Sequence, residues 1–216
     1  MANALKEPGH TSDYASNTSS KDQTMQKTVI TRILHAALAV AIVHQLVTSL
    51  FMERPRPGGS SGNFAFEFHE AVGLASLGLL ALFWLWTVVR RGETDPGALF
   101  PWFSAERRRR VFADIRDIVG GLVRRRFPPL ATEMPLASAV HGLGLLVATA
   151  MATTGAIVYA SMGADGSLTG GGHLVLELHE VLANLMWAYL IGHSAMAIGH
   201  DMAGQRILGA MFFGRQ

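Results

Sequence analysis

The distribution of charge is the feature that most constrains this fold. Four stretches contain no Asp, Glu, Lys or Arg, and they are Ile33–Met52, Ala71–Val89, Leu136–Met162 and Val181–His200. An α-helix rises about 1.5 Å per residue, so roughly 20 residues cross a hydrocarbon core about 30 Å thick. Backbone groups in lipid must be satisfied within each segment. The sequence therefore predicts four transmembrane helices.

Composition supports the same class of protein. Of 216 residues, 50% are hydrophobic and 16% are charged, whereas a soluble domain carries about 25% charged residues. Cysteine is absent, which excludes disulfides, iron–sulfur clusters, Cys zinc sites, thiol catalysis and covalent haem attachment. Any metal must be held by His, Met or carboxylate groups.

The chain divides into a tail and one domain. Residues 1–28 are polar and are expected to form a disordered cytoplasmic tail. Residues 29–213 are expected to form an all-α, four-transmembrane-helix bundle, with spans near 31–52, 64–89, 135–161 and 173–200. From Ser104 to Phe127, apolar residues recur at helical spacing beside Arg and Asp. This pattern predicts an in-plane amphipathic helix between the second and third spans, with a docking face for a soluble partner as the alternative.

Basic residues are unevenly distributed between the two sides of the membrane. With four spans, the side that holds both termini and the middle loop carries 16 of the 18 Lys and Arg residues. Only Arg54 and Arg56 lie on the other side. The positive-inside rule places both termini in the cytoplasm of a multi-pass protein in the bacterial inner membrane. The excess positive charge then matches anionic membrane lipid and does not indicate nucleic acid.

Two histidines on the fourth span carry the strongest functional signal. His179 and His193 are 14 residues apart, which places them about 40° apart around a helix and ~21 Å apart along it. Ionisable residues inside a membrane are costly and mark functional sites. A haem iron takes two axial ligands, and neutral imidazole suits that role. The spacing predicts two haems, one near each face.

Depth in the membrane assigns the partners. His69 opens the second span on the outer side, so it is expected to pair with His179. His35 opens the first span on the inner side, so it is expected to pair with His193. The expected cofactors are two bis-histidine b haems with these four residues as iron ligands. No side chain is expected to be catalytic in its own right.

The remaining histidines leave several roles open. His44 lies about 180° around the helix from His35, and packing, a quinone or proton contact, or ligation all remain. His141 has the inner depth, which fits a quinone or propionate contact, an axial ligand or an ordinary packing role. His173 and His200 are expected near the surface. Arg54 and Arg56 are ordinary loop charge, or they attract an anionic donor or a partner protein.

The pattern formed by several of these residues resembles that of the prokaryotic cytochrome b561 family. This family shares its fold with the di-haem cytochrome b subunits of nickel–iron hydrogenases and formate dehydrogenases. The resemblance covers residues 27–213. It rests on the segment Arg32–His35, on His69 with Gly73, on His141–Gly144 with Thr154–Gly155, and on His179–Asn184 followed by Gly192–His193 and His200.

The resemblance implies a function and a set of partners. It implies transmembrane electron transfer that exchanges electrons with the quinone pool of a respiratory chain. One alternative is a haem-bearing membrane anchor for a periplasmic hydrogenase or dehydrogenase subunit. Another is a stand-alone superoxide:quinone oxidoreductase, so whether the chain is an enzyme stays open. The expected partners are membrane lipid, quinone and a periplasmic redox protein, with a homodimer left open.

Overall fold

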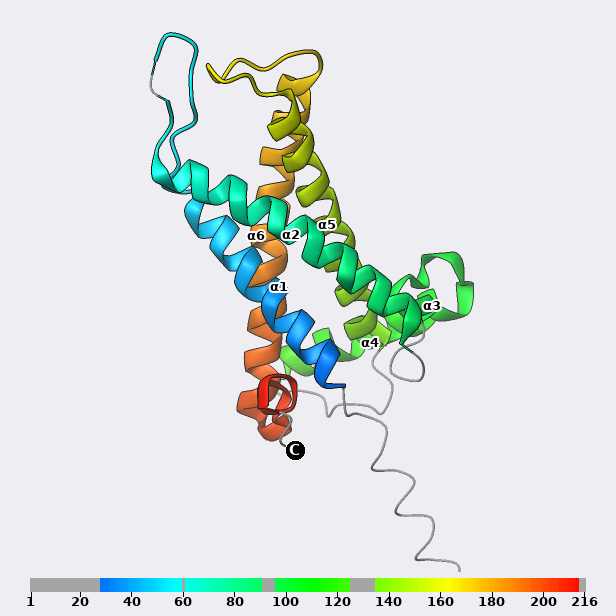
Figure 1. Ribbon diagram of the computed structural model, residues 1–216. Coiled ribbons are helices and arrows are strands. Elements are labelled where there is room, and N and C mark those ends of the chain that lie inside the picture. Colours follow the sequence, from blue (N-terminus) through cyan, green and yellow to red (C-terminus); the bar gives the residue numbers. More distant parts are fainter. Residues whose placement is uncertain (1–27, 60, 91–95, 125–134, 214–216) are drawn as a thin grey trace, which may run out of the picture.

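The computed structural model describes residues 28–59, 61–90, 96–124 and 135–213. The elements in order are α1 (Val29–Thr48), α2 (Phe64–Val89), α3 (Pro96–Leu99), η1 (Pro101–Phe103), α4 (Ala105–Val123), α5 (Pro135–Ser161), α6 (Gly172–His200), η2 (Asp201–Gln205) and η3 (Gly209–Phe213). Four of these helices, α1, α2, α5 and α6, are long and apolar enough to cross a membrane. The predicted four-helix bundle is confirmed (Figure 1). The expected disordered tail lies almost entirely outside the described residues.

The four long helices pack in chain order. α1 packs against α2, α2 against α5, and α5 against α6. The connections at residues 49–59, 61–63 and 162–171 lie at one end of the bundle, called the loop end below (Figure 1). The start of α1, the α3 and α4 helices, and η2 and η3 lie at the other end, called the terminal end.

Side-chain caps set where the first two long helices begin. The Thr28 hydroxyl accepts the N–H of Thr31 at 3.3 Å, and Asn63 Oδ1 accepts the N–H of Phe66 at 3.0 Å. Each cap satisfies an N–H that has no partner within its helix. α1 ends at Thr48, before the expected Met52. The reason is that Leu50 and Phe51 donate to carbonyls three residues back, at 3.1 and 3.0 Å, which tightens the last turn.

Polar side chains join the helices across the bundle. Trp86 Nε1 donates to Thr31 Oγ1 of α1 at 2.8 Å, and Trp84 Nε1 donates to Thr149 Oγ1 of α5 at 3.0 Å. In lipid, a polar group that is left unpaired is costly. These bonds therefore fix the position of α2 between α1 and α5.

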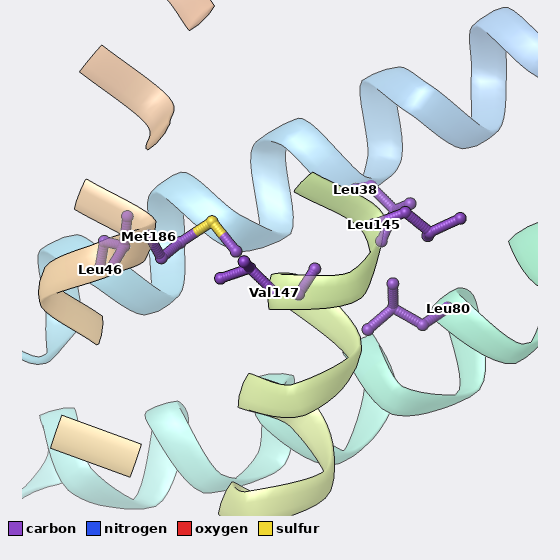
Figure 2. Close-up of a cluster of buried hydrophobic side chains, with 7 residues drawn as sticks. Leu38, Leu46, Leu80, Leu145, Val147 and Met186 are labelled. Carbon is purple, nitrogen blue, oxygen red and sulfur yellow. The ribbon is translucent and has the colours of Figure 1, made fainter. Parts of the chain in front are cut away.

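An apolar cluster fills the middle of the bundle (Figure 2). It contains Leu38, Leu46, Leu80, Leu145, Val147, Ala148 and Met186, contributed by all four long helices. The outer surface is apolar as well, since Val40, Val88 and Leu174 are at least 70% exposed. Apolar residues on both the inside and the outside are typical of a bundle whose surface contacts lipid.

The described part of the segment between α2 and α5, α3 to α4, folds against the terminal end. A Cβ atom on Gly142 would lie 1.9 Å from the carbonyl oxygen of Leu99, so α3 rests directly on the α5 backbone. In α4, Val111 is buried, and the Asp114 carboxylate accepts the N–H of Leu136 at the start of α5 at 3.0 Å. The predicted amphipathic helix is therefore present at Ala105–Val123, and residues 125–134 lie outside the described part of the chain.

Candidate haem sites

Two histidines face each other near the loop end. His69 of α2 and His179 of α6 have ring centroids 6.5 Å apart and planes at 90°. Both side chains are partly buried. Residues that lie 110 positions apart in the chain are thus brought together, as their depth predicts. We call these two residues the loop-end pair.

A threonine contacts Nδ1 of each ring in the loop-end pair. Thr154 Oγ1 lies 2.9 Å from Nδ1 of His179, and Thr48 Oγ1 lies 3.2 Å from Nδ1 of His69. Each hydroxyl already donates its one proton to a carbonyl of its own helix, Ala150 O and His44 O respectively, both at 2.8 Å. With the hydroxyl proton on that carbonyl, the ring nitrogen is the donor to the threonine. This leaves the lone pair on Nε2, the nitrogen that a metal would take.

A glycine leaves space for the His179 ring against α5. A Cβ atom on Gly155 would lie 3.1 Å from Cε1 of His179, closer than most side-chain contacts. Gly155 follows Thr154 directly, so consecutive residues of α5 supply the space and the hydrogen bond for this ring.

Three histidines meet at the terminal end: His35 of α1, His141 of α5 and His193 of α6. Each has a ring nitrogen within 4.8 Å of a nitrogen of the other two. The ring centroids of His35 and His193 are 6.3 Å apart, as are those of His35 and His141, whereas His141 and His193 are 5.1 Å apart. The expected pair is thus brought together, with His141 as a third member. We call this group the terminal-end triad.

Aromatic rings surround the triad. Tyr189 stacks on His193 with centroids 5.4 Å apart and planes at 9°, and its ring occupies the space that a Cβ atom on Gly144 would fill. Phe212 meets His35 edge-on at 6.4 Å. The guanidinium of Arg32 donates to the carbonyls of Met211 and Phe212 at 3.2 and 3.3 Å, which holds this C-terminal segment beside the triad.

The donor atoms and separations fit haem iron. A histidine nitrogen lies about 2 Å from a metal ion, so two imidazoles on opposite sides of one ion have centroids roughly 6 Å apart. The loop-end pair at 6.5 Å and the His35–His193 pair at 6.3 Å both meet that requirement. Neutral imidazole is also a common axial ligand for a low-spin b-type haem.

Comparison with known proteins agrees with this chemistry. The family model for prokaryotic cytochrome b561 matches residues 27–214. The chain belongs to this family. No curated protein and no solved structure gave a significant match. As a prokaryotic cytochrome b561, the protein is a multi-pass membrane protein that binds haem b and transfers electrons across the membrane.

Three further histidines in the described part of the chain, His44, His173 and His200, belong to neither group. The ring of His44 packs against that of Phe68, with ring centroids 4.7 Å apart. Both ring nitrogens of His44 are buried without a hydrogen-bond partner. The side chain also lines an open apolar groove of about 670 Å³ along α1. His173 is exposed. His200 Nδ1 lies 2.7 Å from Oε1 of Gln205. Arg54 lies 3.8 Å from the carboxylate of Glu180, and Arg56 is exposed.

Sequence reasoning missed the contacts of three residues at the cytochrome's sites, Thr48, Thr154 and Tyr189, although Thr154 was named as part of the family resemblance. Thr48 and Thr154 belong to different helices from the rings that they contact, so neither helix phase nor depth relates them to a histidine. A threonine inside an apolar helix commonly bonds to its own backbone, and this ordinary role conceals the second contact. Tyr189 lies one turn before His193, and this i to i+4 spacing is the one signal that was available.

Proposed function

We propose that this cytochrome carries electrons between the two faces of a bacterial inner membrane through two bis-histidine b haems and exchanges them with quinone. His69 and His179 hold one haem, and His35 and His193 hold the other. Each bound haem supplies a one-electron iron couple. The chain supplies the ligands, their protonation state, their spacing and a dry surrounding.

One observation carries the proposal: α6 contributes a histidine to both groups. His179 and His193 each face a histidine of another helix at about the separation that one iron requires. Their positions on one continuous helix place the two groups ~21 Å apart along its axis. Met186 lies midway between them, is 2% exposed, and packs with Leu46 and Val147 in the apolar cluster (Figure 2). This packing keeps water out of the space between the two groups.

The charge distribution supports an orientation with the terminal end in the cytoplasm. Phe112, Val119 and Val123 form an exposed apolar stripe on α4, with Arg109 and Arg116 along its edge, and the exposed Arg110 lies about 180° around the helix from Val119. A helix of this kind lies at the membrane surface, with the apolar stripe toward acyl chains and the basic residues toward headgroups.

Because the chain has no cysteine, single-cysteine variants test the orientation directly. Arg56→Cys should react with an impermeant maleimide from the periplasm and Arg206→Cys should not, and the reverse pattern would overturn the orientation.

Quinone exchange is proposed at the terminal end. His141 is exposed there, whereas the loop-end pair is partly covered and held by threonines. The test uses purified, haem-loaded cytochrome that is reduced anaerobically and mixed with decylubiquinone. Reoxidation of the haem absorbance within seconds supports the proposal. Haems that stay reduced as long as in buffer alone contradict it.

The charge at the loop end favours some electron donors over others. Six acidic residues lie in the connections of the loop end and in the first nine residues of α2 and α6, and only two Lys or Arg residues lie there. The acidic residues are Glu53, Glu67, Glu70, Asp165, Glu177 and Glu180, and the basic residues are Arg54 and Arg56. A negative field slows the approach of an anion such as superoxide and favours a protein with a basic patch. A relay subunit that accepts electrons from a periplasmic hydrogenase or dehydrogenase is therefore the second candidate.

One experiment separates the stand-alone enzyme from the relay subunit. Oxidised cytochrome is exposed to superoxide that xanthine oxidase generates, with and without superoxide dismutase. Absence of dismutase-sensitive haem reduction is the result expected for a relay subunit. Rapid reduction that dismutase abolishes would favour the superoxide:quinone oxidoreductase and would show that the acidic loop end does not decide the donor.

A further inference from the structure

The terminal-end triad contains one histidine more than a bis-histidine haem requires. Among the described residues, it is the one group of three or more His, Cys, Asp and Glu side chains whose ligand atoms lie this close together. The loop-end pair has no equivalent third member in that part of the chain. The extra residue therefore distinguishes the two sites.

His35 is the fixed point of the triad. Its ring centroid lies 6.3 Å from that of His193 and 6.3 Å from that of His141, and the planes meet at 55° and 56°. His141 and His193 are closer to each other, at 5.1 Å, than either is to His35. Both rings therefore lie on the same side of His35, and either of them can complete an axial pair with it. Only one can do so at a time, because a haem iron has two axial positions.

The backbone of α5 holds His141 in the tautomer that ligates. Its Nδ1 lies 2.6 Å from the carbonyl oxygen of Ala137. A carbonyl can only accept, so Nδ1 donates and the lone pair is on Nε2. A ligating histidine usually donates its other N–H to such an acceptor. His193 is positioned differently, by stacking on Tyr189.

We propose that the terminal-end haem has one fixed ligand, His35, and that the opposite axial position can be filled by either His193 or His141. This inference rests on the proposed assignment of His35 and His193 to that haem. It gives His141 a role as an alternative ligand, beyond a contact to quinone or propionate.

The test compares haem stoichiometry and spin state in four purified variants. His193→Ala is expected to keep two low-spin haems per chain, with changed electron paramagnetic resonance g values for one of them. His141→Ala is expected to keep both. The double variant His141→Ala/His193→Ala is expected to keep one low-spin haem and to lose the other, or to hold it high-spin. The matched control is His179→Ala, which removes a ligand from the pair without a third histidine and should lose one low-spin haem.

Loss of one low-spin haem in His193→Ala, to the same extent as in the double variant, would overturn the proposal. Retention of the loop-end haem in these variants shows that they are folded. If His193→Ala binds no haem at all, His193→Gln, which preserves more of the side-chain volume, gives the same comparison. The assignment of the site itself fails separately, because His35→Ala would then keep two low-spin haems.

Discussion

Replacing Thr154 with valine tests how the chain controls the loop-end haem. Valine has nearly the shape of threonine and lacks the hydroxyl. Thr154 is 8% exposed, and its Oγ1 accepts the Nδ1 proton of His179 at 2.9 Å. The hydrogen bond makes the imidazole a stronger electron donor. It therefore stabilises oxidised iron, which carries the greater positive charge, more than reduced iron.

The size of the effect follows from the strength of the bond. A buried neutral hydrogen bond contributes about 0.5–1.5 kcal/mol net. If about 1 kcal/mol of that distinguishes the two oxidation states, the midpoint potential rises by about 40 mV, since about 1.4 kcal/mol corresponds to 59 mV for one electron. Thr48→Val should shift the same haem by less, because its contact with His69 is longer, at 3.2 Å.

The assay is a spectroelectrochemical titration of both haems in the purified protein. One component should move to higher potential and the other should stay, because the substituted residue contacts a ring of the loop-end pair. Thr154→Ser retains the hydroxyl and is the matched control, with a potential close to that of the unaltered chain. An unchanged titration in Thr154→Val, or an equal shift in Thr154→Ser, would refute the reasoning.

Three further experiments test other parts of the proposed structure and function. His69→Ala should lower the haem content to one per chain while the other haem keeps its potential, and retention of two low-spin haems would contradict the pairing with His179. Gly142→Ala should lower the thermal midpoint, because its Cβ would lie 1.9 Å from the Leu99 carbonyl oxygen and overpacking costs about 1–3 kcal/mol; Gly78→Ala, with nothing within 4 Å, should not. A nitroxide on Val119→Cys should be more accessible to oxygen than to a water-soluble nickel relaxant, and a nitroxide on Arg110→Cys, about 180° around the helix, should show the opposite, whereas equal values would refute membrane contact by α4.

The four long helices could be predicted because each depends on a local property. An uncharged run of sufficient length must be helical in lipid, and helix phase alone places His179 and His193 on one face. The fold and the family were therefore accessible from the sequence, and the facing of His69 with His179 followed from depth.

Other features depend on packing between helices and could not be read from the pattern. α3, which ends at Leu99 against Gly142, has four residues and is too short for a periodicity signal. The threonine contacts join residues of different helices. The contact between Phe212 and His35 depends on a turn of the chain at Gly204 and Arg206, both of which have positive φ. Depth also could not decide between His141 and His193, because both lie at the same end and on the same side of His35.

The most direct test of the central claim is the haem b content per polypeptide of the purified chain, measured with its reduced-minus-oxidised spectrum. The account predicts two low-spin haems per chain, because two separate groups of facing histidines meet the ligand requirement of iron. One haem per chain after expression with adequate haem supply would contradict the pairing at one end, and none would contradict the assignment of both groups.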